Sequence, residues 1–209
     1  MTNSLHEQVR GYYERKLQAH GPTPTGVDWN SQASQELRFA QLARLWDDER
    51  QVSVLDFGCG YGALLPWLRA RGFDGPYVGF DLSTAMVSAG EQAATDAGLS
   101  GYRFTSDPSR LAPADFVVAS GIFNVKMEIP DQEWRDYMRH TIDELAALAG
   151  RGFAFNALTS YSDIDRRRPD LYYADPLEWF DYCQRTHCRA VALLHDYALY
   201  EFTMIVRRG

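Results

Sequence analysis

Three glycines at alternating positions carry the clearest chemical signal in this sequence. They follow a short apolar run in the segment Val-Leu-Asp-Phe-Gly-Cys-Gly-Tyr-Gly, residues 54–62, and the next residues can begin a helix. Glycine permits tight turns and lets a ligand approach the backbone closely. The amide groups at the start of a helix face the crevice beyond a strand end, where open parallel sheets bind their ligands. The pattern predicts a ligand-binding turn, with Asp56 just before the glycines.

Alternating strands and helices must position this turn. Two predicted helices, at residues 4–19 and 31–47, come first, and apolar strand-like runs then alternate with helical spacing. Such alternation predicts a mostly parallel sheet with helices on both faces. The two closing strands are too near in sequence for a parallel crossover, so the last strand is expected to be antiparallel. The expected strands cover residues 52–57, 77–81, 102–105, 115–120, 152–158, 189–195 and 200–207, and the expected helices between them 62–71, 84–97, 131–149 and 176–186.

The bulk composition narrows the function classes. The 209 residues are 45% hydrophobic and 23% charged, as in a globular domain, and the formal net charge is -7. This acidic balance disfavours a broad nucleic-acid-binding surface, which needs Lys and Arg. Three cysteines without framework spacing fit a reducing compartment, and we find no signal-peptide pattern and no apolar run of membrane-spanning length. We expect a cytoplasmic protein with no membrane segment and no metal site.

The glycine segment resembles the first motif of class I S-adenosylmethionine-dependent methyltransferases. That motif is an apolar pair followed by Asp-x-Gly-x-Gly-x-Gly, and the match includes Asp56 and all three glycines. The resemblance covers about residues 50–207. It implies an α/β, three-layer Rossmann-like methyltransferase fold, with a mostly parallel seven-stranded sheet, an antiparallel last strand and added N-terminal helices. It also implies S-adenosylmethionine as the cofactor and S-adenosylhomocysteine as its product.

Later parts of the family pattern imply the rest of the cofactor site. Asp81 ends the second expected strand, where a carboxylate can accept hydrogen bonds from both ribose hydroxyls. Asp107 follows the third strand, where the family places an acid near the adenine amino group. Residues 115–123 resemble the fourth motif, but Ser-Gly-Ile-Phe at 120–123 replaces the signature of base methylation. The expected cofactor-binding residues are Trp29, Arg38, Asp56, Gly58, Cys59, Gly60, Asp81, Leu82, Met86, Asp107, Ser120, Gly121 and Ile122.

A nicotinamide-binding fold is the main alternative. Gly58, Gly60 and Ala63 also satisfy the dinucleotide fingerprint Gly-x-Gly-x-x-Gly/Ala, with Asp81 at a suitable separation for a ribose acid. Three features favour the methyltransferase: the acid before the glycines, the third glycine at position 62, and the closing pair of strands.

Segments outside the glycine motif supply further candidates. We expect residues 1–48 to form a helical cap or lid and residues 49–209 to form the cofactor-binding domain. Trp29 would cover the adenosyl group, and Arg38 would pair with the methionine carboxylate. The connection at residues 159–175 is long enough to act as a lid. The expected substrate-binding residues are Phe123, Asn124, Lys126 and Tyr161.

These expectations combine into one functional hypothesis. A nucleophilic O, N or C atom of a small molecule would attack the cofactor's methyl group in line, while the protein orients the reactants and excludes water. No catalytic base is assigned, because a neutral, basic nucleophile needs none. Two alternatives stay open: methylation of RNA or protein, and a protein that binds the cofactor without transferring the methyl group.

Overall fold

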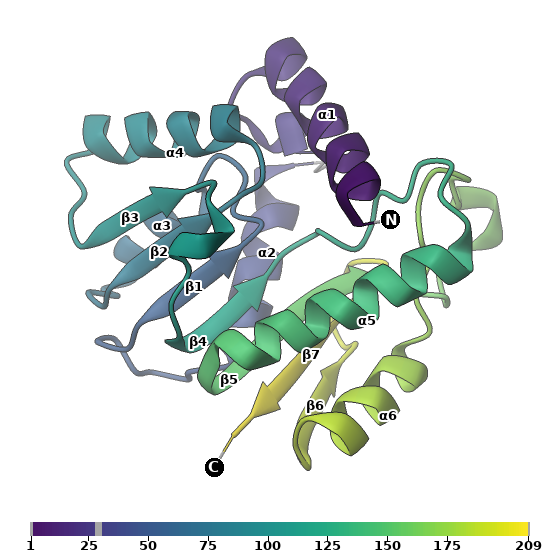
Figure 1. Cartoon of the computed structure of the whole chain (residues 1–209). Coiled ribbons are helices and arrows are strands. Elements are labelled where there is room, and N and C mark those ends of the chain that lie inside the picture. Colours follow the sequence, from purple (N-terminus) through teal and green to yellow (C-terminus); the bar gives the residue numbers. More distant parts are fainter. Residues whose placement is uncertain (1, 28–30, 209) are drawn as a thin grey trace.

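Seven short apolar runs form one central sheet in the computed structural model, which describes residues 2–27 and 31–208, with side chains from Leu5 onward. The strand order is β3-β2-β1-β4-β5-β7-β6 (Figure 1). All neighbouring strands are parallel except β7, which is antiparallel to both β5 and β6, as the short final connection predicts. The strands are β1 (Val54–Phe57), β2 (Tyr77–Phe80), β3 (Tyr102–Thr105), β4 (Ala114–Ala119), β5 (Ala149–Leu158), β6 (Ala190–Leu194) and β7 (Glu201–Arg207).

The strand order reverses at β1, and this places the ligand-binding edge. β1 pairs with β2 on one side and β4 on the other, with Asp56 aligned with Gly79 and with Val118. The carboxyl ends of β1, β2 and β4 therefore meet at one edge of the sheet. In open α/β sheets ligands bind outside the carboxyl ends of the strands, at the point where the order reverses.

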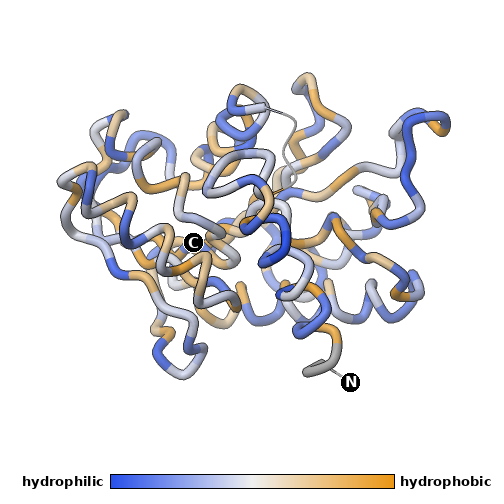
Figure 2. The backbone as a smooth tube through the Cα atoms, turned by 90° about the horizontal axis from the view of Figure 1, so that it is seen from above, coloured by the Kyte–Doolittle hydropathy of each residue, from blue (hydrophilic) through white to orange (hydrophobic). Residues whose placement is uncertain are grey.

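Helices cover both faces of the sheet. In Figure 1, α5 and α6 lie in front of it and α2 and α3 lie behind it. Each face buries its own hydrophobic cluster, and Figure 2 shows apolar chain through the middle of the molecule with hydrophilic turns around it. The helices are α1 (Thr2–His20), α2 (Gln32–Ala43), α3 (Leu64–Arg69), α4 (Thr84–Asp96), α5 (Asp131–Leu148) and α6 (Pro176–Thr186), with short 3-10 helices η1 (Pro24–Val27), η2 (Pro108–Arg110) and η3 (Ile164–Arg166).

Side-chain caps explain where three helices begin. The Ser31 hydroxyl accepts a hydrogen bond from Ser34 N, the Ser83 hydroxyl one from Met86 N, and the Asp175 carboxylate one from Leu177 N. Each cap satisfies a backbone donor that the first helical turn leaves without a partner. These starts agree with the sequence prediction. The connection between β3 and β4, too short for a full helix, forms only the single turn η2.

The two N-terminal helices occupy different parts of the fold. In α2, Phe39 and Leu42 pack in the same cluster as Val54 and Phe116 of the sheet, so α2 forms part of one layer. By contrast, α1 lies across the carboxyl edge of the sheet (Figure 1), with Leu5 joined to the cluster under α5. The cap or lid predicted for residues 1–48 therefore contains one helix, α2, that packs as part of a layer, and another, α1, that does not. The division at residue 48 stays a prediction.

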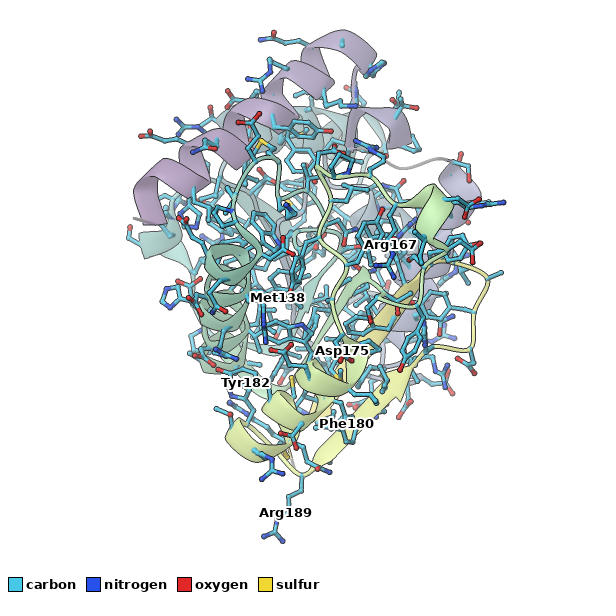
Figure 3. The ribbon with its side chains drawn as sticks, turned by 90° about the vertical axis from the view of Figure 1, so that its right-hand side faces the viewer. Met138, Arg167, Asp175, Phe180, Tyr182 and Arg189 are labelled. Atoms are coloured by element: carbon cyan, nitrogen blue, oxygen red, sulfur yellow. The ribbon has the colours of Figure 1, made fainter. Side chains whose placement is uncertain are left out.

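The connection after β5 is more ordered than the sequence indicates. It contains η3 and forms isolated bridges that join Thr159 to Ala174 and Val125 to Leu171. It leads to α6, which lies beside α5 (Figure 3), where the Tyr182 hydroxyl donates to Asp143 Oδ1 at 2.6 Å. The labelled Arg189 points away from the molecule just before β6. Within the described chain, every helix is too short or too polar to cross a membrane.

Candidate functional site

The turn after β1 needs its glycines for backbone conformation and for space. Gly58, Gly60 and Gly62 have φ angles of +80°, +53° and +76°, a region that other residues adopt only with strain. A Cβ atom at Gly58 would lie 2.3 Å from Ile122 Cγ2, and one at Gly62 would lie 2.6 Å from the Phe104 ring. The turn can therefore approach the β4 exit closely enough to form one continuous wall.

Asp81 is tied to this turn by hydrogen bonds to both carboxylate oxygens. Gly60 N donates to Oδ2 and Ser83 N donates to Oδ1, each at 2.9 Å. Burial raises the pKa of Asp81, and the hydrogen bonds from Ser83 and Gly60 oppose that rise. A carboxylate has about four acceptor positions, so one on each oxygen is left for a ligand hydroxyl. This arrangement suits the two adjacent hydroxyls of a ribose.

Asp56 lies deeper, inside β1, where it is almost completely buried. The Tyr77 hydroxyl donates a hydrogen bond to Asp56 Oδ2 at 2.7 Å. Burial raises the pKa of Asp56 to about 7, and the hydrogen bond from Tyr77 offsets that rise only in part. A positively charged ligand beside this carboxyl would favour its ionised form.

A pocket opens between these strand ends and α1. Its wall includes ten of the thirteen predicted cofactor-binding residues, from β1 and the glycine turn, the end of β2, the first turn of α4 and the β4 exit. Other lining side chains come from α1, η1, α2 and α5. Those predicted from the sequence are Asp56, Gly58, Cys59, Gly60, Asp81, Leu82, Met86, Ser120, Gly121 and Ile122; those not predicted include Val9, Arg10, Tyr13, Val27, Gln35, Phe39, Phe57, Tyr61, Phe80 and Tyr137.

Helix α1 is held over the pocket by contacts to the N-cap residue of α4, to α5 and to the hydrophobic core. The Ser83 hydroxyl donates to Glu14 Oε1 at 3.1 Å, and the His6 and Tyr137 rings meet edge to face at 5.8 Å between centroids. Leu5 anchors the start of the helix in the core. The helical spacing of apolar residues predicts this helix from the sequence. The structure adds that the side of the helix with Val9, Arg10 and Tyr13 faces the pocket.

Two of the predicted cofactor residues, Asp107 and Arg38, do not lie on the pocket wall. The Asp107 carboxylate caps η2 by accepting from Ser109 N at 2.9 Å, and it is exposed. The Arg38 guanidinium forms a buried bidentate pair with Glu201, in which Arg38 Nε lies 2.8 Å from Glu201 Oε2. The Nε and Nη2 edge of Arg38 is therefore taken by Glu201, and Arg38 is not among the residues that line the pocket. Trp29 lies outside the described residues.

The four predicted substrate-binding residues are not gathered into one site. Phe123 is 0% exposed and packs against Phe155, while Asn124 Oδ1 accepts from Leu158 N. Lys126 Nζ lies 3.3 Å from Asp131 Oδ1. Tyr161 is 64% exposed on the outer loop. Short side chains directly after a strand can turn inward to satisfy the backbone, and sequence alone does not reveal this direction.

The pocket's chemistry suits a nucleoside with a charged tail. Apolar walls from Leu82, Met86 and Ile122 can enclose a base, Asp81 can accept from ribose hydroxyls, and Arg10 can bind a carboxylate. Among the described lining residues there is no histidine and no lysine. The described part of the chain also holds no group of three or more His, Cys, Asp or Glu side chains placed to bind a metal ion.

Known proteins share this sequence and architecture. The methyltransferase domain family model matches residues 29–199. A Mycobacterium tuberculosis (strain ATCC 25618 / H37Rv) protein named "Putative methyltransferase Rv1506c" is 51% identical over 157 residues, which are 75% of this chain and 93% of that protein.

Two solved structures, both from methyltransferases, have a similar fold. Magnesium protoporphyrin IX methyltransferase from Synechocystis PCC 6803, with bound S-adenosylmethionine, has a TM-score of 0.66 and 18% identity over 98% of this chain and 97% of its own. The N-methyltransferase NodS from Bradyrhizobium japonicum WM9, with bound S-adenosylhomocysteine, has a TM-score of 0.66 and 17% identity over 96% of this chain and 98% of its own. The chain therefore belongs to the methyltransferase domain family and is a class I S-adenosylmethionine-dependent methyltransferase.

Proposed function

We propose that this enzyme methylates a small-molecule acceptor. The observation that carries the proposal is the cover over the pocket: Val9, Arg10 and Tyr13 of α1 line it opposite the glycine turn. A pocket partly covered by a helix admits a small acceptor more readily than a folded macromolecule. The formal net charge of -7 also disfavours an RNA acceptor. The fold does not decide this point, because its structural neighbours include both a magnesium protoporphyrin IX methyltransferase and a ribosomal protein L11 methylase.

We assign the cofactor to the pocket as follows. Asp81 accepts hydrogen bonds from the ribose hydroxyls, and Leu82 and Met86 enclose the adenine. Arg10 pairs with the methionine carboxylate, because it is the single Lys or Arg side chain among the described lining residues. Asp56 is buried in β1, just before the glycine turn. When ionised, its carboxylate contributes negative potential towards the cationic end of the cofactor.

The protein's own residues bind, orient and exclude water. S-adenosylmethionine, when bound, supplies a methyl group on a sulfonium, which a nucleophile displaces in line. Because the described lining residues include no histidine or lysine, we assign no protein base. The acceptor then has to present an atom that is already nucleophilic, such as a neutral amine or an ionised hydroxyl. Helix α1 would open to admit the ligands and close to exclude water.

The test is transfer of labelled methyl from S-adenosylmethionine into a cell extract separated by size. Label in the low-mass fraction, reduced with Asp81→Ala, is the expected result and provides a product to identify. Label confined to RNA or protein would overturn the small-molecule proposal. Cofactor binding by calorimetry with no transfer into any fraction would instead favour a protein that binds the cofactor without catalysis.

A further inference from the structure

Strand β4 leaves the sheet earlier than its neighbour β5 does. The paired register ends with Ala119 opposite Phe155, but β5 continues to Leu158. The chain turns at Gly121, whose φ angle is +76°, and Ser120, Gly121 and Ile122 line the cofactor pocket. Gly121 is buried, so its backbone N–H needs an acceptor that the strand ladder no longer supplies.

The side chain of Asn156 supplies that acceptor. Gly121 N donates to Asn156 Oδ1 at 2.8 Å, and Asn156 Nδ2 donates to Ser120 Oγ at 3.3 Å. Asn156 is 0% exposed. On one side its strand pairs with β7, where Thr203 is its partner, and on the other side its own side chain contacts the β4 exit. It is not itself part of the pocket wall, although both of its partners are.

The direction of these hydrogen bonds has a chemical consequence. A backbone N–H can only donate, so it must meet the Asn156 oxygen, and the amide NH₂ must then face Ser120. Since the NH₂ group is a donor, Ser120 Oγ accepts from it, and the serine keeps its own proton for another partner. That partner can lie in the pocket, because Ser120 lines it.

We propose that Asn156 is a positioning residue for the cofactor: it fixes the β4 exit turn and orients Ser120 as a hydrogen-bond donor to bound S-adenosylmethionine. This inference rests on the cofactor site proposed above. Asparagine suits the position because it offers one acceptor and one donor without a charge. A leucine would fill the same space but leave Gly121 N without a partner, and an ionised aspartate would draw the Ser120 proton towards itself.

The test compares Asn156→Leu with Ser53→Ala as a matched control. Ser53 precedes β1, and its hydroxyl donates to Asp115 Oδ2 at 2.7 Å and accepts from Asp115 N at 2.8 Å. The control thus removes hydrogen bonds at the opposite edge of the same sheet. Both variants should melt at lower temperatures. Only Asn156→Leu should bind S-adenosylmethionine and S-adenosylhomocysteine more weakly, by about tenfold or more in calorimetry. Equal affinity in Asn156→Leu and wild type would overturn the proposal.

The isosteric variant Asn156→Asp gives a readout that a purely structural role would not move. Burial raises the pKa of such an aspartate, and its protonated form can again donate to Ser120. Its loss of affinity relative to wild type should therefore shrink as the pH falls from about 8 to about 5. A ratio independent of pH, or equal to one throughout, would contradict the proposal, and this measurement carries the test if Asn156→Leu does not fold.

Asp81→Ala separates failure of this inference from failure of the proposed site. If Asp81→Ala weakens cofactor binding and both Asn156 variants bind as wild type does, the positioning role alone is wrong. If Asp81→Ala also binds normally, the assignment of the pocket to the cofactor fails as well.

Discussion

Gly60 N donates a hydrogen bond to Asp81 Oδ2 at 2.9 Å, so the glycine turn after β1 and the acid after β2 form one unit. The two residues follow neighbouring parallel strands, and the contact links the backbone that approaches the cofactor to the carboxylate that we assign to its ribose. Disturbing either residue should therefore affect the other half of the site.

Asp81→Ala should weaken S-adenosylmethionine binding by about tenfold to a hundredfold, because the ribose hydroxyls lose a charged acceptor and Gly60 N loses its partner. Isothermal calorimetry measures the change. Asp115→Ala is the control: that carboxylate accepts hydrogen bonds from Ser53 N and Oγ at the far edge of the sheet. It should lower thermal stability and leave the affinity unchanged.

The stability of the unliganded enzyme should depend on pH through Asp56. Its pKa is about 7 in the folded protein and 3.8 in the unfolded reference, so the folded state holds the proton more tightly. This contribution to stability is complete below pH 3.8 and is lost as the pH rises to about 7. Asp56→Asn should flatten the unfolding free energy across that interval, by an amount on the order of a few kcal/mol. Parallel denaturant titrations of both proteins would show it; identical pH curves would refute it.

Gly58→Ala should cost more than strain alone. Its φ angle is +80°, and the added Cβ would lie 2.3 Å from Ile122 Cγ2. The unfolding free energy should fall by about 2–4 kcal/mol, with loss of cofactor affinity. Gly98→Ala is the matched control, because Gly98 has φ +63° with nothing within 4 Å of the added carbon. That variant should lose about 1 kcal/mol and bind the cofactor normally.

Arg10→Ala should weaken S-adenosylmethionine binding by about fivefold to twentyfold, and raising the salt concentration should reduce the difference, because the proposed ion pair lies at an exposed pocket rim. Arg15→Ala, on the same helix but outside the pocket wall, should bind as wild type does. Equal affinities for the two variants would show that the methionine carboxylate has another partner.

The Arg38–Glu201 pair should act on stability. The two side chains are 6% and 1% exposed, so removing one partner leaves a buried charge. Arg38→Met should cost about 3–5 kcal/mol in unfolding free energy. The double variant Arg38→Met/Glu201→Leu should lose less than that single variant, because no charge is left uncompensated. A double-mutant cycle in urea tests this, and strictly additive losses would argue against a coupled pair.

The sequence by itself determined the layered fold and the inner wall of the pocket. Alternating apolar runs and helical segments produce a parallel sheet because each element has to bury one face. The motif glycines are recognisable because their backbone angles exclude other residues, and Asp81 because it ends a strand beside them. Such features depend on neighbours that are near in sequence or in the strand order.

Only the tertiary structure decided which way the remaining side chains point. Arg38 and Glu201 lie 163 positions apart and meet because α2 packs against β7, and no local pattern signals that buried pair. In the sequence, Asn156 is one polar residue in an apolar strand. Because β4 ends before β5 does, the Asn156 side chain can accept a hydrogen bond from Gly121 N and support the cofactor wall. Arg10 reaches the pocket because α1 crosses the sheet edge. For Arg38 and Asn156 the physical reason is that buried polar groups must find partners. For all three residues, the neighbours are fixed by packing between segments that are distant in sequence.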